Sequence, residues 1–169
     1  MSRMSQAPAA PPPAAAEEDT VPARKPRSVL FLCGMNSIRS PMAEALAKRM
    51  LPKSTFIASA GVRSGDRDPF VDAVLAEEKL SLGDFRPRRF DDLEDSYFEL
   101  IITMAPEAHH AALELTRSMA IDVEYWPTLD PSAIEGTREQ IIAAYRDLRD
   151  ALAQQIARRF TTSASVDET

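Results

Sequence analysis

The sequence predicts an α/β fold in which helices cover a parallel β-sheet, and two observations lead to this prediction. Short apolar runs that suit strands alternate along the chain with segments in which apolar residues recur at helical spacing. The first of these runs is almost entirely apolar, as expected of a strand that is buried on both faces. Strands that are joined through helices in this way pair in parallel through right-handed crossovers.

The first predicted strand is Ser28–Cys33, and a short polar loop leads from it into a predicted helix over Ser40–Leu51. Four apolar residues at positions i, i+3, i+4 and i+7 form one face of this helix. They are Ala43, Leu46, Ala47 and Met50. Ser40 is predicted to be the N-cap residue, and Pro41 suits the first helical position.

Three further strands and three further helices are expected to follow in alternation. The predicted strands are Thr55–Gly61, Phe98–Ala105 and Ile121–Trp126. The predicted helices are Asp68–Leu80, which has Asp68 as its N-cap, Pro106–Thr116 and Thr137–Phe160. Ligands bind at the carboxyl ends of parallel strands, so Cys33 and the loop Pro127–Pro131 after the fourth strand are expected to face each other.

One folded domain is expected over residues 28–160. The chain has 169 residues, of which 44% are hydrophobic, and this is enough for a single core. Residues 1–27 are rich in proline and alanine and poor in large apolar side chains, which predicts a disordered extension. Residues 161–169 are predicted to be a polar tail.

The charge and composition argue against several classes of function. The chain has a formal net charge of −6, which argues against nucleic acid or an anionic membrane surface as its partner. No stretch is apolar over enough residues to span a membrane, and the first residues lack the basic segment followed by an apolar segment that is typical of a secretory signal. One cysteine and two histidines cannot form a cysteine-rich zinc site. A cytoplasmic protein without a metal or a cofactor is therefore expected, and its oligomeric state stays open.

Cys33 is the only cysteine of the chain, and it ends the first predicted strand at the start of a polar loop. A cysteine thiolate is a good nucleophile, and a helix N-terminus and a nearby cation such as Arg39 both favour it. The loop Gly34–Ile38 is expected to present backbone N–H groups to a tetrahedral oxyanion, and Arg39 adds a planar fork for two oxygens. The Ser40 hydroxyl can donate a hydrogen bond to the thiolate, which favours the charged form. The alternative is an inert core cysteine beside a solvated arginine, and the Cys-x5-Arg-Ser-Pro context favours the functional hypothesis.

The stretch VLFLCGMNSIRSPMAEAL resembles the phosphate loop of the low-molecular-weight protein tyrosine phosphatase family, which includes arsenate reductases of the same fold. The resemblance covers about Ser28 to Phe160 and includes Ser59–Gly61 and the late Asp130-Pro131. It implies a three-layer sandwich in which a four-stranded parallel sheet is flanked by helices. It also implies a phosphorylated small molecule or a phosphoprotein as the substrate.

The resemblance further assigns roles to individual residues. Cys33 would attack phosphorus and form a phosphocysteine, while Arg39 and the loop amides hold the equatorial oxygens. Asp130 would protonate the leaving oxygen and then accept a proton from water. On spacing alone, Asp130 would count as an ordinary loop aspartate before a proline. The predicted substrate-binding residues of the loop are Gly34, Met35, Asn36, Ser37, Ile38 and Ser40.

The sequence departs from the usual pattern of these phosphatases at three places. Gly34 and Met35 stand in the opposite order, and Ile38 stands where a second loop cysteine is common. Aromatic residues are absent directly after Asp130-Pro131 and from Gly61–Pro69, which predicts a pocket without the usual aromatic walls. Two alternatives to a phosphatase follow: an arsenate reductase that uses an external thiol, and a non-catalytic module that binds phosphate or a phosphoprotein.

Other candidate residues are predicted to have structural roles. His109 and His110 are adjacent on a predicted helix and cannot both face one site, so a metal site is not expected there. The basic stretch Phe85–Phe90 is predicted to be a solvated loop. Tyr125 and Trp126 are predicted to pack in the core.

Overall fold

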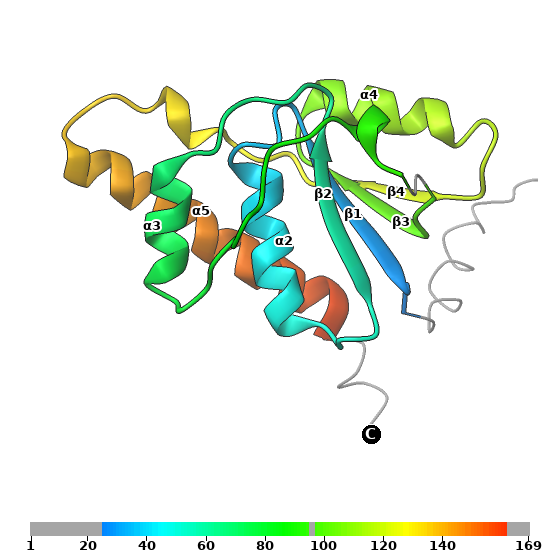
Figure 1. Cartoon of the computed structure of the whole chain (residues 1–169), viewed down its shortest axis with the longest axis horizontal. Coiled ribbons are helices and arrows are strands. Elements are labelled where there is room, and N and C mark those ends of the chain that lie inside the picture. The colour runs from blue at the N-terminus through cyan, green and yellow to red at the C-terminus, as the bar shows by residue number, and fades with distance from the viewer. Residues whose placement is uncertain (1–24, 95–96, 162–169) are drawn as a thin grey trace, which may run out of the picture.

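A four-stranded parallel sheet forms the centre of the structure, a computed structural model that describes residues 25–94 and 97–161. Its strands lie in the order β2-β1-β3-β4, and each pairing between neighbours is parallel (Figure 1). Their bounds are β1 (Ser28–Cys33), β2 (Phe56–Gly61), β3 (Leu100–Thr103) and β4 (Asp122–Tyr125). The predicted strands are confirmed, although three of them are one to four residues shorter than expected.

Helices cover both faces of this sheet, so the fold is the expected three-layer α/β sandwich (Figure 1). The helices are α2 (Arg39–Met50), α3 (Pro69–Ala76), α4 (Pro106–Leu115) and α5 (Arg138–Ile156). Helices α2 and α5 pack on one face, α3 lies against them, and α4 packs on the other face. Short 3₁₀ turns at Phe90–Asp92 and Pro131–Ala133 and a π-helical turn at Ala157–Thr161 complete the structure.

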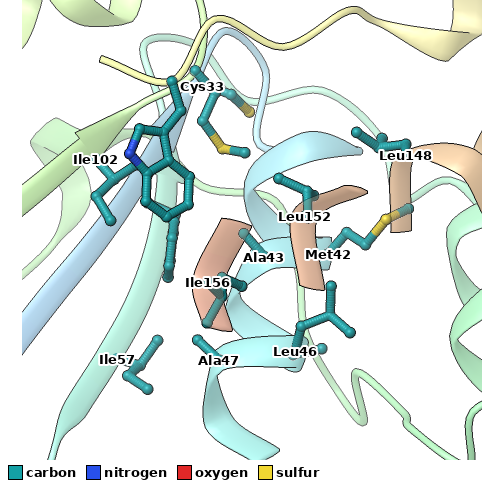
Figure 2. Close-up of a cluster of buried hydrophobic side chains, with 14 of the residues drawn as sticks. Cys33, Met42, Ala43, Leu46, Ala47, Ile57, Ile102, Leu148, Leu152 and Ile156 are labelled. Atoms are coloured by element: carbon teal, nitrogen blue, oxygen red, sulfur yellow. The ribbon is translucent and has the colours of Figure 1, made fainter. Parts of the chain in front are cut away.

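Strand β1 shows why its sequence is apolar at nearly every position. Phe31 packs into the core beneath α2 and α5, and its neighbour Leu32 packs into the core beneath α4. Successive side chains of a strand point to opposite faces, so a strand covered on both sides needs apolar residues throughout. Figure 2 shows the first of these cores, in which Cys33 lies at one end and the side chains of α2 and α5 fill the centre.

The start of α2 differs from the prediction. The helix begins at Arg39, its N-cap is Ile38, and no side chain caps it. Ser40 is therefore not the N-cap, and Pro41 is the third helical residue rather than the first. The physical reason is that the Ser40 hydroxyl is used elsewhere, beside the Cys33 sulfur.

The predicted N-cap of α3 and the predicted start of α5 are confirmed. The Asp68 side chain accepts a hydrogen bond from the backbone N–H of Phe70 at 2.8 Å and caps α3. Helix α3 ends at Ala76, four residues before its predicted end, because the chain turns away with Lys79 in the left-handed region at φ 62°. Thr137 and Gln140 form a capping box at the start of α5.

Strand β4 lies at the edge of the sheet, and this position explains a second correction. Trp126 is buried and packs against Phe31 at 6.1 Å between ring centroids, as predicted. Tyr125 is instead 39% exposed and stacks on His109, with 4.6 Å between ring centroids. An edge strand has one neighbour only, so its outer residues reach the surface.

A buried arginine joins α3 to α5. The Arg149 guanidinium donates to the carbonyl oxygen of Val74 at 2.7 Å and to the carboxylate of Glu77 at 2.9 Å. Glu77 also accepts three hydrogen bonds of 2.9–3.1 Å from Arg146. These bonds to Arg146 and Arg149 lower the pKa of Glu77 from its usual 4.5 to about 2.

Replacement of Glu77 by glutamine is expected to lower the free energy of unfolding at neutral pH and to have less effect in acid. The folded protein depresses the pKa of Glu77, so this stabilisation is complete above about pH 4.5 and disappears as the pH falls toward 2. Urea unfolding of the wild type and Glu77→Gln at several pH values measures the difference. Glu135→Gln removes an exposed carboxylate and is the control. A difference that stays constant down to pH 3 would rule out the linkage.

The predicted extension, residues 1–27, and the predicted tail, residues 161–169, lie mostly outside the described residues, so both stay predictions. Within the described ranges, no helix combines the length and the apolar character that crossing a membrane requires.

Candidate active site

The loop between β1 and α2 surrounds the sulfur of Cys33. Cys33 is only 2% exposed, and its Sγ lies 2.9 Å from the Oγ of Ser40. The backbone N–H of Asn36 donates to the same sulfur at 3.3 Å. The sulfur therefore has a hydroxyl and an amide within hydrogen-bond reach, as the sequence predicted for Ser40.

The buried side chain of Asn36 stabilises the loop through hydrogen bonds. Asn36 is fully buried, has a left-handed backbone at φ 56°, and its Nδ2 donates to Ser40 Oγ at 2.9 Å and to Ser59 Oγ at 3.0 Å. Its Oδ1 accepts from the backbone N–H of Arg88 at 2.9 Å. Ser59 in turn donates to the buried Glu44 carboxylate at 2.6 Å. Hydrogen bonds through Asn36 and Ser59 thus link Ser40, the partner of Cys33, to Glu44 one turn further along α2.

Replacement of Asn36 by alanine is expected to destabilise the fold by about 2–4 kcal/mol. The change removes bonds from buried groups and leaves a residue with a Cβ in a left-handed conformation. Asn36→Gly removes the same bonds but tolerates the backbone, so its loss should be about 1 kcal/mol smaller. Urea unfolding of both variants measures the two contributions. Equal stability of the alanine variant and the wild type would show that this network does not hold the loop.

The segment after β2 fixes the other side of the loop. Its backbone N–H groups donate to loop carbonyls: Val62 to Cys33 at 3.1 Å, Arg63 to Gly34 at 2.8 Å and Gly65 to Met35 at 2.9 Å. Gly61 permits this approach, because a Cβ there would lie 2.7 Å from the Asn36 nitrogen and 2.8 Å from the Met35 carbonyl carbon. The loop carbonyls are therefore used outside the site.

The loop N–H groups, in contrast, are free for a ligand. Among the described residues, the N–H groups of Gly34, Met35, Ser37 and Ile38 donate to no protein acceptor. Met35 does not have a positive φ, so this position does not require glycine. With the reversed Gly34-Met35 order, the loop thus still has four unpaired backbone donors, and successive backbone N–H groups are a common way to bind an anion.

Arg39 connects the loop to the segment after β4. Its Nη1 donates to the carbonyl oxygen of Thr128 at 2.9 Å and to that of Met104 at 3.4 Å. Its Nη2 lies 3.9 Å from the Asp130 Oδ2. The loops after the first and fourth strands therefore meet at one edge of the sheet, as parallel pairing predicted.

Asp130 lies in a hydrogen-bonded turn that uses only one of its two carboxylate oxygens. Its Oδ1 accepts from the backbone N–H of Ser132 at 2.9 Å and from the Ser132 hydroxyl at 2.7 Å. Its side chain is 45% exposed, and its Oδ2 faces Arg39. The turn explains why Asp130 resembles an ordinary loop aspartate in the sequence. The partly exposed Oδ2, next to Arg39 in the cavity, is the oxygen that could transfer a proton.

These residues line a cavity of about 520 Å³. Six of the predicted site residues are part of its wall: Cys33, Met35, Ser37, Ile38, Arg39 and Asp130. The other three predicted site residues, Gly34, Asn36 and Ser40, do not line it. Asn36 and Ser40 lie behind the wall, where they support the loop.

The cavity has aromatic walls, which corrects the sequence-based expectation. Phe70 and Tyr145 both line it, with 5.2 Å between their ring centroids. The Tyr145 hydroxyl donates to Asp68 at 2.8 Å, and burial together with this carboxylate raises the pKa of Tyr145 well above its usual range. The expectation was wrong because the rings come from helices α3 and α5, outside Gly61–Pro69 and the residues directly after Asp130-Pro131.

In the basic stretch Phe85–Phe90, Arg86 and Arg89 are exposed as predicted, but Arg88 differs from the prediction. Arg88 is half-buried. Its backbone N–H donates to Asn36 Oδ1 at 2.9 Å, and its Nε donates to the Ser59 carbonyl oxygen at 3.1 Å. Arg88 is thus a structural support of the loop rather than a solvated cation. Of the two adjacent histidines, His109 lies 3.0 Å from the Thr103 hydroxyl through its Nδ1.

Comparisons with known proteins agree with this geometry. Residues 28–158 match the family model described as low molecular weight phosphotyrosine protein phosphatase. An arsenate reductase of Bacillus licheniformis is 28% identical over 132 residues, which cover 78% of this chain and 94% of that protein.

Two solved structures are similar as well. The tyrosine phosphatase AmsI of Erwinia amylovora has a TM-score of 0.62 at 23% identity and covers 81% of this chain and 95% of its own. An arsenate reductase of Archaeoglobus fulgidus has a TM-score of 0.55 at 30% identity, and the match covers 76% of this chain and 98% of that protein. Because the family model spans most of the chain and the loop around Cys33 is intact, the protein belongs to the low molecular weight phosphotyrosine protein phosphatase family.

Proposed function

We propose that the protein is a cysteine-dependent phosphatase that hydrolyses phosphate monoesters through a phosphocysteine. One observation carries the proposal: Cys33, Arg39 and Asp130 line the same cavity, and the loop that follows Cys33 carries unpaired N–H groups. A nucleophile, an anion site and a proton donor are the three groups that this reaction needs.

In the first step, the Cys33 thiolate attacks phosphorus and the bond from phosphorus to the ester oxygen breaks. The loop N–H groups hold the equatorial oxygens. Arg39 uses only Nη1 for the protein carbonyls, so its Nε and Nη2 can bind two further oxygens. Asp130, as a carboxylic acid, gives its proton to the leaving oxygen.

In the second step, water attacks the phosphocysteine, and Asp130 accepts the proton that water loses. The bond between phosphorus and sulfur breaks, which returns the thiolate and releases inorganic phosphate. Ser40 Oγ, 2.9 Å from the sulfur, can donate to the thiolate as it leaves. The products are one alcohol or phenol and one phosphate, so atoms and charges balance.

The aromatic walls support an aryl phosphate, including protein phosphotyrosine, as the substrate. Phe70 is partly exposed in the cavity wall and can pack against a phenyl ring, and such a pair contributes about 0.5–1.5 kcal/mol beyond burial. Tyr145 is 2% exposed and supports the Phe70 ring, with 5.2 Å between the ring centroids. Hydrolysis of 4-nitrophenyl phosphate at mildly acidic pH by the purified full chain tests the function. A protein that binds phosphate in calorimetry without any turnover would be a binding module instead.

An arsenate reductase is the second candidate, and the curated relatives named arsenate reductase at 28% identity support it. Arsenate has the shape and charge of phosphate, so the same loop could hold it. Cys33 is the only cysteine, so the two electrons that reduce arsenate to arsenite must come from external thiols, which leave as a disulfide. Arsenate-dependent consumption of glutathione or a similar thiol is the test, and its absence would count against this activity.

A further inference from the structure

Three exposed apolar side chains come from the segments that form the cavity. Met35, Leu129 and Ile134 are 41%, 89% and 46% exposed, and each comes from a segment beside the site. Met35 and Ile134 line the cavity, and Leu129 directly precedes Asp130 outside it. We call these three residues the apolar collar. Large apolar side chains that gather at one place on a surface commonly mark a site of interaction.

The backbone holds these side chains at the surface. The carbonyl oxygen of Thr128, directly before Leu129, accepts from Arg39 at 2.9 Å, and Asp130 directly after it caps the next turn. The carbonyl oxygen of Met35 accepts from the Gly65 N–H at 2.9 Å. The contacts of Arg39 and Asp130 thus fix the backbone on both sides of Leu129.

We propose that the apolar collar docks the apolar residues that flank the phosphorylated residue of a protein substrate. This inference rests on the proposed phosphatase function. Met35 and Ile134 line the same cavity as Arg39, so a ligand that fits both the cavity and the collar carries an anion for the cavity and apolar groups beside it. A phosphorylated polypeptide segment has this arrangement. A small aryl phosphate that fits the cavity leaves Leu129 outside, since Leu129 is not part of the cavity wall.

The test compares two phosphotyrosine peptides of equal length and charge on the full chain. One carries leucine and isoleucine on both sides of the phosphotyrosine, and the other carries serine and asparagine. The wild type is expected to have a kcat/KM about tenfold higher for the apolar peptide, which corresponds to about 1.4 kcal/mol. In Leu129→Asn this ratio should fall to about twofold. A general loss of activity would lower kcat/KM for both peptides equally, so it would leave their ratio unchanged.

Leu113→Asn is the matched control. Leu113 is 43% exposed on α4 and does not line the cavity, so this variant should keep the tenfold ratio. A wild type that hydrolyses 4-nitrophenyl phosphate but treats the peptides alike would retain the proposed function and overturn the docking inference. A ratio that survives Leu129→Asn would overturn it too. A wild type that hydrolyses no phosphate ester contradicts the proposed function itself.

A second copy of the chain is the other possible occupant, and sedimentation distinguishes it. Under the assay conditions the wild type is expected to sediment as the same species as Leu129→Asn. A wild-type dimer that Leu129→Asn converts to monomer would assign the apolar collar to self-association and overturn the inference.

Discussion

Replacement of Cys33 by serine is expected to lower kcat for 4-nitrophenyl phosphate by on the order of 10⁴-fold or more, because it removes the group that forms the covalent bond. A serine hydroxyl at this place has no general base within hydrogen-bond reach, since the sulfur's protein partners are Ser40 Oγ and the Asn36 N–H. Steady-state hydrolysis by the wild type and the variant measures the effect.

The fold and the anion site should survive this change. Serine is slightly smaller than cysteine, and the loop N–H groups and Arg39 stay in place, so Cys33→Ser is expected to bind inorganic phosphate in calorimetry. The urea midpoint of the variant serves as the control for folding. A folded variant that retains most of the wild-type kcat would show that Cys33 is not the nucleophile.

Replacement of Asp130 by asparagine is expected to slow the hydrolysis of phenyl phosphate by about 10²–10⁴-fold, the usual contribution of general acid catalysis. Phenolate is a poor leaving group and needs the proton, whereas 4-nitrophenolate leaves more readily, so its ester should be slowed less. Asparagine keeps an oxygen that can accept from Ser132, so the turn is preserved. The measurement is the ratio of kcat for 4-nitrophenyl phosphate to kcat for phenyl phosphate, determined for the wild type and for the variant.

Asp66→Asn is the matched control for Asp130. Asp66 is an exposed carboxylate in the wall of the same cavity, and among the described residues it has no hydrogen-bond partner. Its replacement changes the charge of the cavity equally but removes no proton donor near Arg39, so the ratio for the two esters should not change. Equal slowing of both esters by Asp130→Asn would remove Asp130 from the role of general acid.

Much of the fold could be predicted because its signals are local. The apolar run at Ser28–Cys33 and the alternation that follows it identify a parallel sheet covered on both faces, and Asp68 at its helix start is a local cap. Helix ends were less predictable. Ser40 has the sequence of an N-cap, but the Cys33 sulfur and Asn36 compete for its hydroxyl, and only the tertiary structure decides this competition.

The candidate site was predictable where it lies in one loop and unpredictable where distant segments complete it. Cys33, Arg39 and Ser40 lie within eight residues, so their proximity is evident from the sequence. Tyr145 and Arg88 come from elements far along the chain, and their contacts with Asp68 and Asn36 depend on how those elements pack. Phe70 had a usable signal: it is the second residue of the helix that Asp68 caps, at the edge of the sheet where the site lies.

The most direct test of the central role of Cys33 is to detect its phosphorylated form. The wild type is mixed with 4-nitrophenyl phosphate, quenched within milliseconds and digested, and the peptide that contains Cys33 is analysed by mass spectrometry. The expected result is phosphate on Cys33 in the quenched wild type, together with a burst of nitrophenol equal to the enzyme concentration where the second step is slower. Turnover with no phosphate on Cys33, or with phosphate on another residue, would contradict the mechanism.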